Sequence, residues 1–223
     1  MTKEERLARQ AARLREEEER THRMYAYERD AGMGALFIAG VDEVGRGPLA
    51  GPVVAGAVIL PADHEILRLN DSKKLSEKRR EEMNEIIRAE AVSVGIGEVP
   101  QERIDEINIL QATYEAMRLA LAQLDPPADL ILADAVTIPD IATPQQAIVK
   151  GDAKSASIAA ASIVAKVYRD HLMMAWDERY PVYGFASHKG YGTKAHIEAI
   201  RTYGPCPLHR RSFIRNIVDD TNG

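Results

Sequence analysis

Residues 40–51, G-V-D-E-V-G-R-G-P-L-A-G, join two apolar segments and carry two adjacent acids between them. Asp42 and Glu43 end the first apolar run, and a second run, residues 53–60, begins after Pro52. A strand that enters a protein core is not expected to end on two neighbouring anions unless something neutralises them. A divalent cation with oxygen ligands would do so. The alternative is a polar strand end that enters a Gly/Pro turn, and for an isolated Asp-Glu pair this is the simpler interpretation.

The apolar segments on either side of this stretch predict an antiparallel pair of strands, because they are short, rich in β-branched residues and closely connected. Further strands follow, with helices between and after them. The pattern predicts strands at about 35–42, 53–60, 92–99, 129–133 and 145–149, and helices at about 77–91, 101–124, 153–178 and 194–203. Strands that first form a meander and then alternate with helices predict an α/β domain with a mixed sheet.

Residues 1–34 precede this domain and are rich in charge. They are expected to form a helix at about 3–30, whose thin apolar stripe stops after Leu14, so that no coiled-coil repeat develops. The sequence therefore predicts a charged helical N-terminal extension, 1–34, and one domain, 35–223, which includes a helical C-terminal tail. Whether the extension serves a partner is left open by its sequence.

The composition is that of a globular protein, with 45% hydrophobic and 28% charged residues. The single cysteine, Cys206, excludes an internal disulfide framework and is typical of a reducing compartment. No apolar stretch has the length of a transmembrane helix or the character of a signal peptide, so we expect a cytoplasmic protein that has no membrane partner. The net charge of −5 argues mildly against a nucleic-acid partner, but residues 150–223 carry eleven basic against seven acidic side chains and permit a basic face there.

Further acids stand at other points where regular structure is expected to end. Asp134 follows the apolar strand at 129–133, and Asp152 lies between the last strand and its helix. Functional sites of α/β sheets form where strands end, so Asp42, Glu43, Asp134 and Asp152 are candidates for one site. Four close carboxylates repel one another, and two Mg²⁺ or Mn²⁺ ions about 4 Å apart would relieve this repulsion and act on a phosphodiester. For Asp152 by itself a helix N-cap is the simpler interpretation, and spacing does not show that all four converge.

These motifs resemble those of bacterial ribonuclease HII. The resemblance covers roughly residues 36–215 and rests on several motifs in the family's order: G-V-D-E-V-G-R-G-P-L-A-G-P-V-V at 40–54, D-S-K-K-L-S at 71–76, I-L-A-D-A at 131–135, K-G-D-A-K-S at 150–155, H-K-G-Y-G-T at 188–193 and H-R-R-S-F at 209–213. It implies the ribonuclease H-like fold, a five-stranded mixed sheet with flanking helices. It also implies that Asp42, Glu43, Asp134 and Asp152 are the catalytic, metal-binding acids, with Mg²⁺ or Mn²⁺ as the cofactor.

The resemblance also implies a substrate-binding role for Gly45, Arg46, Gly47, Lys73, Lys74 and Tyr191. The Gly-Arg-Gly loop would contact the ribonucleotide at the cut site, because two residues without side chains allow the backbone to approach a 2′-hydroxyl. Tyr191 would pack on the next deoxyribose, and the alternative is an ordinary half-buried loop tyrosine. The two lysines are candidate phosphate contacts, although a solvated surface position is the more common situation of any single lysine.

The resemblance thus predicts a metal-dependent endoribonuclease that acts as a monomer on nucleic acid. It is expected to hydrolyse the RNA strand of RNA/DNA hybrids and to incise duplex DNA 5′ to a single embedded ribonucleotide, leaving 3′-hydroxyl and 5′-phosphate ends. Two alternatives stay open: a ribonuclease HIII-like hybrid nuclease, whose relatives carry a larger N-terminal platform, and a non-catalytic nucleic-acid-binding module, which leaves the acids without a role. Dinucleotide binding is excluded, because Gly45, Gly47 and Gly51 have the wrong spacing and lead into a strand.

Overall fold

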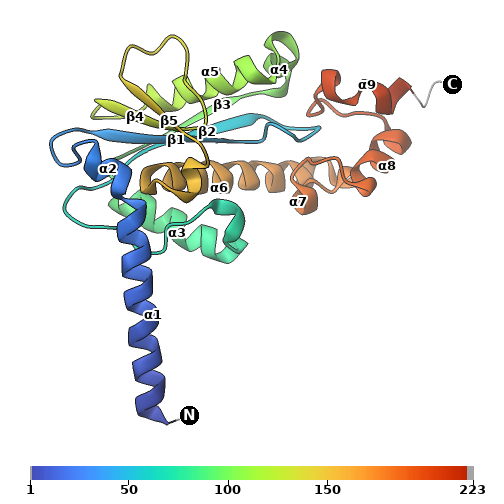
Figure 1. Cartoon of the computed structure of the whole chain (residues 1–223). Helices are drawn as coiled ribbons and strands as arrows, with labels where there is room; N and C mark the ends of the chain where they lie inside the picture. Colours follow the sequence, from blue (N-terminus) through green and yellow to red (C-terminus); the bar gives the residue numbers. More distant parts are fainter. Residues whose placement is uncertain (1, 220–223) are drawn as a thin grey trace.

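A mixed sheet with the strand order β3-β2-β1-β4-β5 forms the centre of this computed structural model, which describes residues 2–219 (Figure 1). Its strands are β1 (Ile38–Val44), β2 (Val53–Ile59), β3 (Ser93–Val99), β4 (Leu130–Asp134) and β5 (Gln145–Ile148). The pairs β1–β2 and β2–β3 are antiparallel, whereas β4 runs parallel to both β1 and β5. The prediction of an α/β fold with a five-stranded mixed sheet is confirmed.

Helices cover both faces of this sheet. α4 (Gln101–Ile107) and α5 (Ile109–Leu121) lie on one face, and α3 (Glu77–Glu90) and α6 (Ala156–Arg179) lie on the other (Figure 1). An apolar core fills each interface, one beneath α5 and one between the sheet, α3 and α6. The sheet is therefore buried on both faces, which explains why β2 and most of β1 are continuously apolar.

The helix predicted at 101–124 is interrupted. Asn108 has a φ of 69°, and its side-chain oxygen accepts hydrogen bonds from the backbone N–H groups of Leu110 and Gln111 at 3.0 and 3.2 Å. With a ψ of 164°, Asn108 has an extended backbone of positive φ that ends α4, and its side chain caps the helix that follows. The apolar periodicity continues across the break, and for that reason the sequence pattern did not reveal it.

Helix α6 lies against β1 at unusually close range. A Cβ atom added at Gly40 would overlap the backbone of Ser157 and Ile158, so only glycine permits this approach. The first half of α6 is accordingly rich in small residues, with Ala159, Ala160 and Ala161 all fully buried. This packing places the N-terminal half of α6 beside the acids of β1.

The N-terminal segment consists of α1 (Lys3–Met24) and α2 (Ala26–Asp30). Most of α1 projects away from the rest of the structure (Figure 1). Its last turn does not, because Met24 and Tyr25 are buried in the core that α3 and α6 share, and the Tyr25 hydroxyl accepts a hydrogen bond from the N–H of Ile66 at 3.0 Å. The domain boundary at residue 34 stays a prediction, and the structure shows that residues 24–25 pack with the sheet-containing body.

The C-terminal third gathers at the far end of α6. It contains α7 (Phe185–His188), α8 (Lys194–Tyr203) and α9 (Arg211–Asp219), which share a small apolar core with that end of α6. Short 3₁₀ helices η1 (Ser72–Lys74), η2 (Gly151–Ala153) and η3 (Pro181–Tyr183) stand in the connections. Among residues 2–219, no helix combines the length and apolar character that crossing a bilayer requires.

Candidate active site

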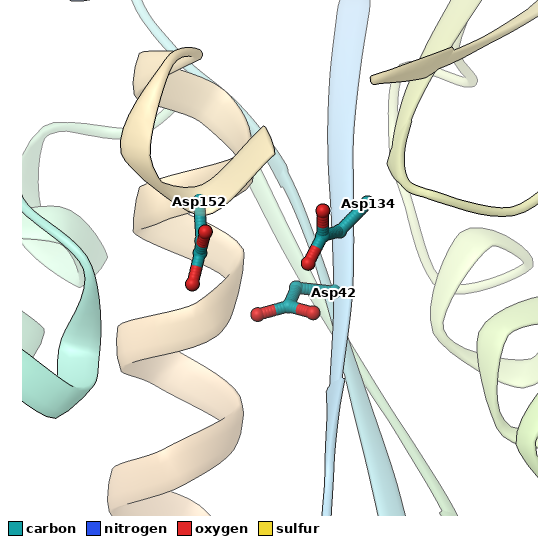
Figure 2. A group of neighbouring side chains, drawn as sticks. All are labelled: Asp42, Asp134 and Asp152. Carbon is teal, nitrogen blue, oxygen red and sulfur yellow. The ribbon is translucent and has the colours of Figure 1, made fainter. Parts of the chain in front are cut away.

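Three aspartates from three separate segments meet at one end of the sheet (Figure 2). Asp42 lies on β1, Asp134 is the last residue of β4, and Asp152 belongs to η2. The parallel register pairs Val41 with Ala133, so the next residues, Asp42 and Asp134, are neighbours. One carboxylate oxygen from each aspartate lies within 4.8 Å of the other two. The structure therefore brings together three of the four predicted acids.

Backbone hydrogen bonds hold these carboxyl groups in place. The N–H of Gly151 donates to Oδ1 of Asp134 at 2.7 Å and thereby ties the end of β4 to η2. The N–H of Glu43 donates to Oδ1 of Asp42 at 2.8 Å. The nearest cation is Lys73, whose Nζ lies 3.8 Å from Oδ2 of Asp152. The two backbone hydrogen bonds orient the side chains of Asp42 and Asp134, and the ion pair with Lys73 is the contact of Asp152.

The electrostatics of the cluster are unfavourable for ionised carboxyl groups. Burial raises the pKa of Asp42 well above its usual range, and repulsion by Glu43 and Asp134 raises it further. Burial also raises the pKa of Asp152, with repulsion by Asp71 and Asp134 adding to the effect and Lys73 opposing it. A positive charge at the centre of the three aspartates would favour their ionised forms.

The donor set fits a hard divalent cation. All three side chains offer carboxylate oxygens, the ligands that Mg²⁺ and Mn²⁺ prefer, and these oxygens are close enough to share an ion. Asp42 and Asp152 are 6% and 7% exposed, so the cluster is sheltered but reachable from the surface. Asp42, Asp134 and Asp152 are therefore the residues that would hold the metal.

Glu43 lies next to this cluster without belonging to it. It follows Asp42 on β1, where successive side chains point to opposite faces, and its Oε1 accepts a hydrogen bond from Nη1 of Arg46 at 3.3 Å. Burial raises the pKa of Glu43, Arg46 opposes this shift, and repulsion by Asp134 adds to it. The side chain is thus close enough to Asp134 to feel its charge, and its predicted role as a metal ligand stays a prediction.

A groove of about 520 Å³ runs past the aspartates. It is lined by Asp71, Lys73, Lys74, Asp134, Ala135, Val149, Lys150, Asp152 and Ala153. Both lysines of the D-S-K-K motif therefore face the groove that contains the acids. The side chain of Lys73 is 80% exposed, which leaves its ammonium group accessible to a ligand.

The Gly45–Gly47 loop and Tyr191 lie beside each other, although they are far apart in the sequence. Gly45 has a φ of 91°, and a Cβ atom there would overlap the side chain of Arg169, so glycine is required on both counts. A Cβ atom at Gly47 would be 3.7 Å from Cε1 of Tyr191, whose side chain is 45% exposed. The structure therefore joins the two predicted substrate-recognition motifs into one surface.

Two buried arginines that the sequence analysis did not identify hold this surface together. Arg210 donates to the carbonyl oxygens of Gly45 at 2.5 Å and Arg46 at 2.9 Å, and Arg169 donates to those of Ala50 at 3.0 Å and Lys189 at 2.9 Å. Both arginines are 0% exposed, and burial lowers the pKa of Arg169 to about 10 and that of Arg210 to about 9. A basic residue within the apolar stripe of a helix is the one signal that would have found Arg169.

Glu28 is a second residue that the sequence analysis missed. This α2 side chain is 1% exposed, and its Oε1 accepts hydrogen bonds from Ser155 Oγ at 2.5 Å and from the N–H and Oγ of Ser157 at 2.9 and 2.7 Å. The N-cap of α6 is Ser155, so capping of this long helix does not account for Asp152. Glu28 thus fixes the start of α6 directly after the loop that carries Asp152.

Comparison with known proteins agrees with this geometry. The sequence model of the family described as Ribonuclease HII matches residues 39–216 of the chain. Ribonuclease HII of Lachnoclostridium phytofermentans is 62% identical over 182 residues, which are 82% of this chain and 72% of that protein. Ribonuclease HII of Bacillus subtilis is 59% identical over 191 residues, which are 85% of this chain and 69% of that protein.

A solved structure shows the same fold. The crystal structure of the ribonuclease H2 from Pyrococcus horikoshii OT3 superimposes with a TM-score of 0.69 at 27% sequence identity. The match covers 83% of this chain and 98% of that one. The family match at residues 39–216 includes all three aspartates.

Proposed function

The chain belongs to the ribonuclease HII family, and from this premise we propose that it hydrolyses the RNA strand of RNA/DNA hybrids and incises duplex DNA 5′ to single embedded ribonucleotides. It is an endoribonuclease by its family, and nucleic acid is its substrate. The observation that supports a hydrolytic metal site is the convergence of Asp42, Asp134 and Asp152 within 4.8 Å. The products are a 3′-hydroxyl and a 5′-phosphate, as expected for a ribonucleotide-repair nuclease that leaves an extendable primer end.

Asp42, Asp134 and Asp152 would hold the divalent metal, Mg²⁺ or Mn²⁺, and Glu43, which pairs with Arg46 beside them, would be a fourth ligand. When bound, a pair of such ions activates the attacking water and stabilises charge on the leaving oxygen. The chain's own contribution is to keep the carboxylates of Asp42 and Asp134 fixed by the N–H groups of Glu43 and Gly151 before substrate arrives. Pre-positioned ligands lower the entropy that is lost when the reacting groups are brought together.

Recognition of RNA within a DNA context falls to the Gly45–Gly47 loop. Arg46 and Gly47 are exposed beside Tyr191, Gly45 is buried, and carbonyl contacts to Arg210 hold the loop in shape, so the polar groups of its exposed part can meet a 2′-hydroxyl without reorganising. The exposed ring of Tyr191 offers an apolar face for the deoxyribose that follows. Together these two elements select a ribonucleotide followed by DNA.

The remaining charged residues position the duplex. Lys73 and Lys74 line the groove of the aspartates and contact phosphates, which orient the substrate but carry no sequence information. The enzyme acts as a monomer in the cytoplasm, where its nucleic-acid substrates form. Its buried free thiol, Cys206, is compatible with a reducing compartment.

The test is a cleavage assay on duplex DNA that carries one ribonucleotide, with Mn²⁺ or Mg²⁺ and with chelator. We expect metal-dependent incision 5′ to the ribonucleotide, and a loss of about a hundredfold or more in Asp134→Asn, because even partners that only orient a metal ligand contribute about 10–100-fold. Asp140→Asn, an exposed aspartate on the following loop, is the matched control and should retain full activity. Incision of long hybrids alone would contradict the proposed substrate, and binding without any cleavage would contradict the proposed chemistry.

A further inference from the structure

A second groove, of about 490 Å³, lies between the N-terminal segment and the loops beside the aspartates. Its walls include Arg20, Arg23, Tyr27, Lys74, Ala153 and Lys154. Lys74 and Ala153 also line the groove that contains Asp134 and Asp152, so the two grooves are neighbours. We name the surface formed by Arg20, Arg23, Tyr27 and Lys154 the α1–α2 groove.

The charge of this groove is opposite to that of the chain as a whole. The net charge of the protein is −5, yet the lining contains four cations and no carboxylate. Arg20 is already paired with Glu17 at 2.6 Å, whereas Arg23, Lys74 and Lys154 are exposed and make no ion pair among residues 2–219. Three cations without partners beside a half-buried tyrosine form a surface suited to a sugar–phosphate backbone.

The groove is preformed because its α1–α2 wall is anchored. Glu28 binds the start of α6 through Ser155 and Ser157, and Tyr25 and Met24 are buried on either side of the bend between α1 and α2. The Arg23 side of the groove is therefore held at a fixed distance from the loop that carries Asp152. A rigid cationic surface loses little entropy when it binds a phosphate strand.

Helix α6 shows on which side of the cut this groove lies. The Gly45–Gly47 loop contacts Arg169 in the second half of α6, whereas Glu28 and the α1–α2 groove meet its first turn. These two ends are separated by fourteen residues, or about 20 Å of helix at 1.5 Å per residue. α2 and α7 accordingly lie near opposite ends of α6 (Figure 1).

We propose that the α1–α2 groove binds the DNA backbone on the 5′ side of the cleaved bond, with Arg23 and Lys154 as its phosphate contacts. The direction rests on the proposed function, in which the ribonucleotide 3′ to the cut occupies the Gly45–Gly47 loop. A strand that leaves this loop passes the aspartates, then Lys74, and then enters the α1–α2 groove. The N-terminal segment is in this way part of the substrate-binding surface.

The experiment compares two duplexes of equal length that each carry one ribonucleotide. In the long-flank duplex the ribonucleotide lies about twelve nucleotides from the 5′ end of its strand, and in the short-flank duplex about three, so that only the long 5′ flank reaches the α1–α2 groove. The variants are Arg23→Gln, Lys154→Gln and the double variant. The matched control is Arg9→Gln, because Arg9 is an exposed arginine on the projecting part of α1. On the long 5′ flank each single variant should raise KM up to about fivefold with kcat unchanged. On the short flank none of the three variants should differ from the unmodified enzyme.

Binding to an all-DNA duplex, followed by fluorescence anisotropy across salt concentrations, tests the groove without any cleavage. Each lost phosphate contact should reduce the slope of log K against log salt by about one. If the unmodified enzyme incises neither duplex but the variants weaken DNA binding, the proposed function and the 5′ direction fail, and the α1–α2 groove stands as a DNA-binding surface. Equal effects of a variant on both duplexes, or an unchanged KM and salt slope, would overturn the groove assignment while leaving the cleavage activity intact.

Discussion

Replacement of Glu28 tests whether the N-terminal segment supports the catalytic body. Three donors converge on its Oε1: Ser155 Oγ at 2.5 Å, the N–H of Ser157 at 2.9 Å and Ser157 Oγ at 2.7 Å. All of these groups are buried, so water cannot replace the carboxylate without opening the interface. The perturbation is Glu28→Ala, with Glu28→Gln as the conservative variant.

The expected loss of unfolding free energy follows from these contacts. A buried donor that loses its acceptor costs about 1–3 kcal/mol. The hydroxyls of Ser155 and Ser157 lie 3.2 Å apart and can partly satisfy each other, so two of the three losses count in full. Glu28→Ala should therefore lose about 4 kcal/mol, a large part of the 5–15 kcal/mol that is typical of a domain. Glu28→Gln keeps an acceptor in place and should lose about 1 kcal/mol, the contribution of a negative charge at a helix N-terminus.

Urea unfolding followed by circular dichroism measures these values, and Ser157→Ala combined with Glu28→Ala gives the coupling between the two side chains. Because Glu28 fixes the helix that follows Asp152, it acts as a positioning residue, and Glu28→Ala should raise the metal concentration for half-maximal activity, whereas Glu28→Gln, which keeps an acceptor, should restore most of the metal affinity. A loss below about 1 kcal/mol for Glu28→Ala, or additive effects in the double variant, would refute the role assigned to this contact.

Two further predictions concern the C-terminal third. Lysine cannot replace the several carbonyl contacts of Arg210, so Arg210→Lys should cost about 3 kcal/mol of unfolding free energy. It should also raise KM for single-ribonucleotide substrates more than it lowers kcat. Arg211→Lys, at an exposed neighbour, is the control and should be neutral in both the urea and the cleavage assays. Burial lowers the pKa of both His196 and His209 to about 4, below the usual value near 6.5. Between these two pH values the unfolded state therefore binds protons more readily than the folded state. Lowering the pH through this window should reduce the unfolding free energy, by about 3 kcal/mol for the first protonation. The two Nε2 atoms lie 3.1 Å apart, and an acid-unfolding series as steep for His196→Gln as for the unmodified protein would contradict this explanation.

Much of the fold was predictable, because each strand carries its own signal. The apolar segments at 53–59 and 130–134 are short, bounded by turn residues and buried on the faces that their patterns indicate. The break at Asn108 was not predictable, since the apolar period of α4 continues in α5 and only the backbone dihedral reveals the interruption. The limit is physical, because a side chain that caps a helix is compatible with the interior of a helix as well.

The candidate site divides in the same way. The sequence by itself determined that Asp134 ends a strand, and its ordered motifs determined the family, because both properties belong to short contiguous stretches, whereas β1 continues past Asp42 to Val44. Only the tertiary structure decided that Asp42, Asp134 and Asp152 share one space while Glu43 turns to Arg46. It also decided that charged side chains enter the interior, since Glu28 meets Ser155 across 127 positions and Arg210 meets Gly45 across 165. A buried charge is tolerated only where distant backbone and hydroxyl groups surround it, and that environment exists only once the chain has folded.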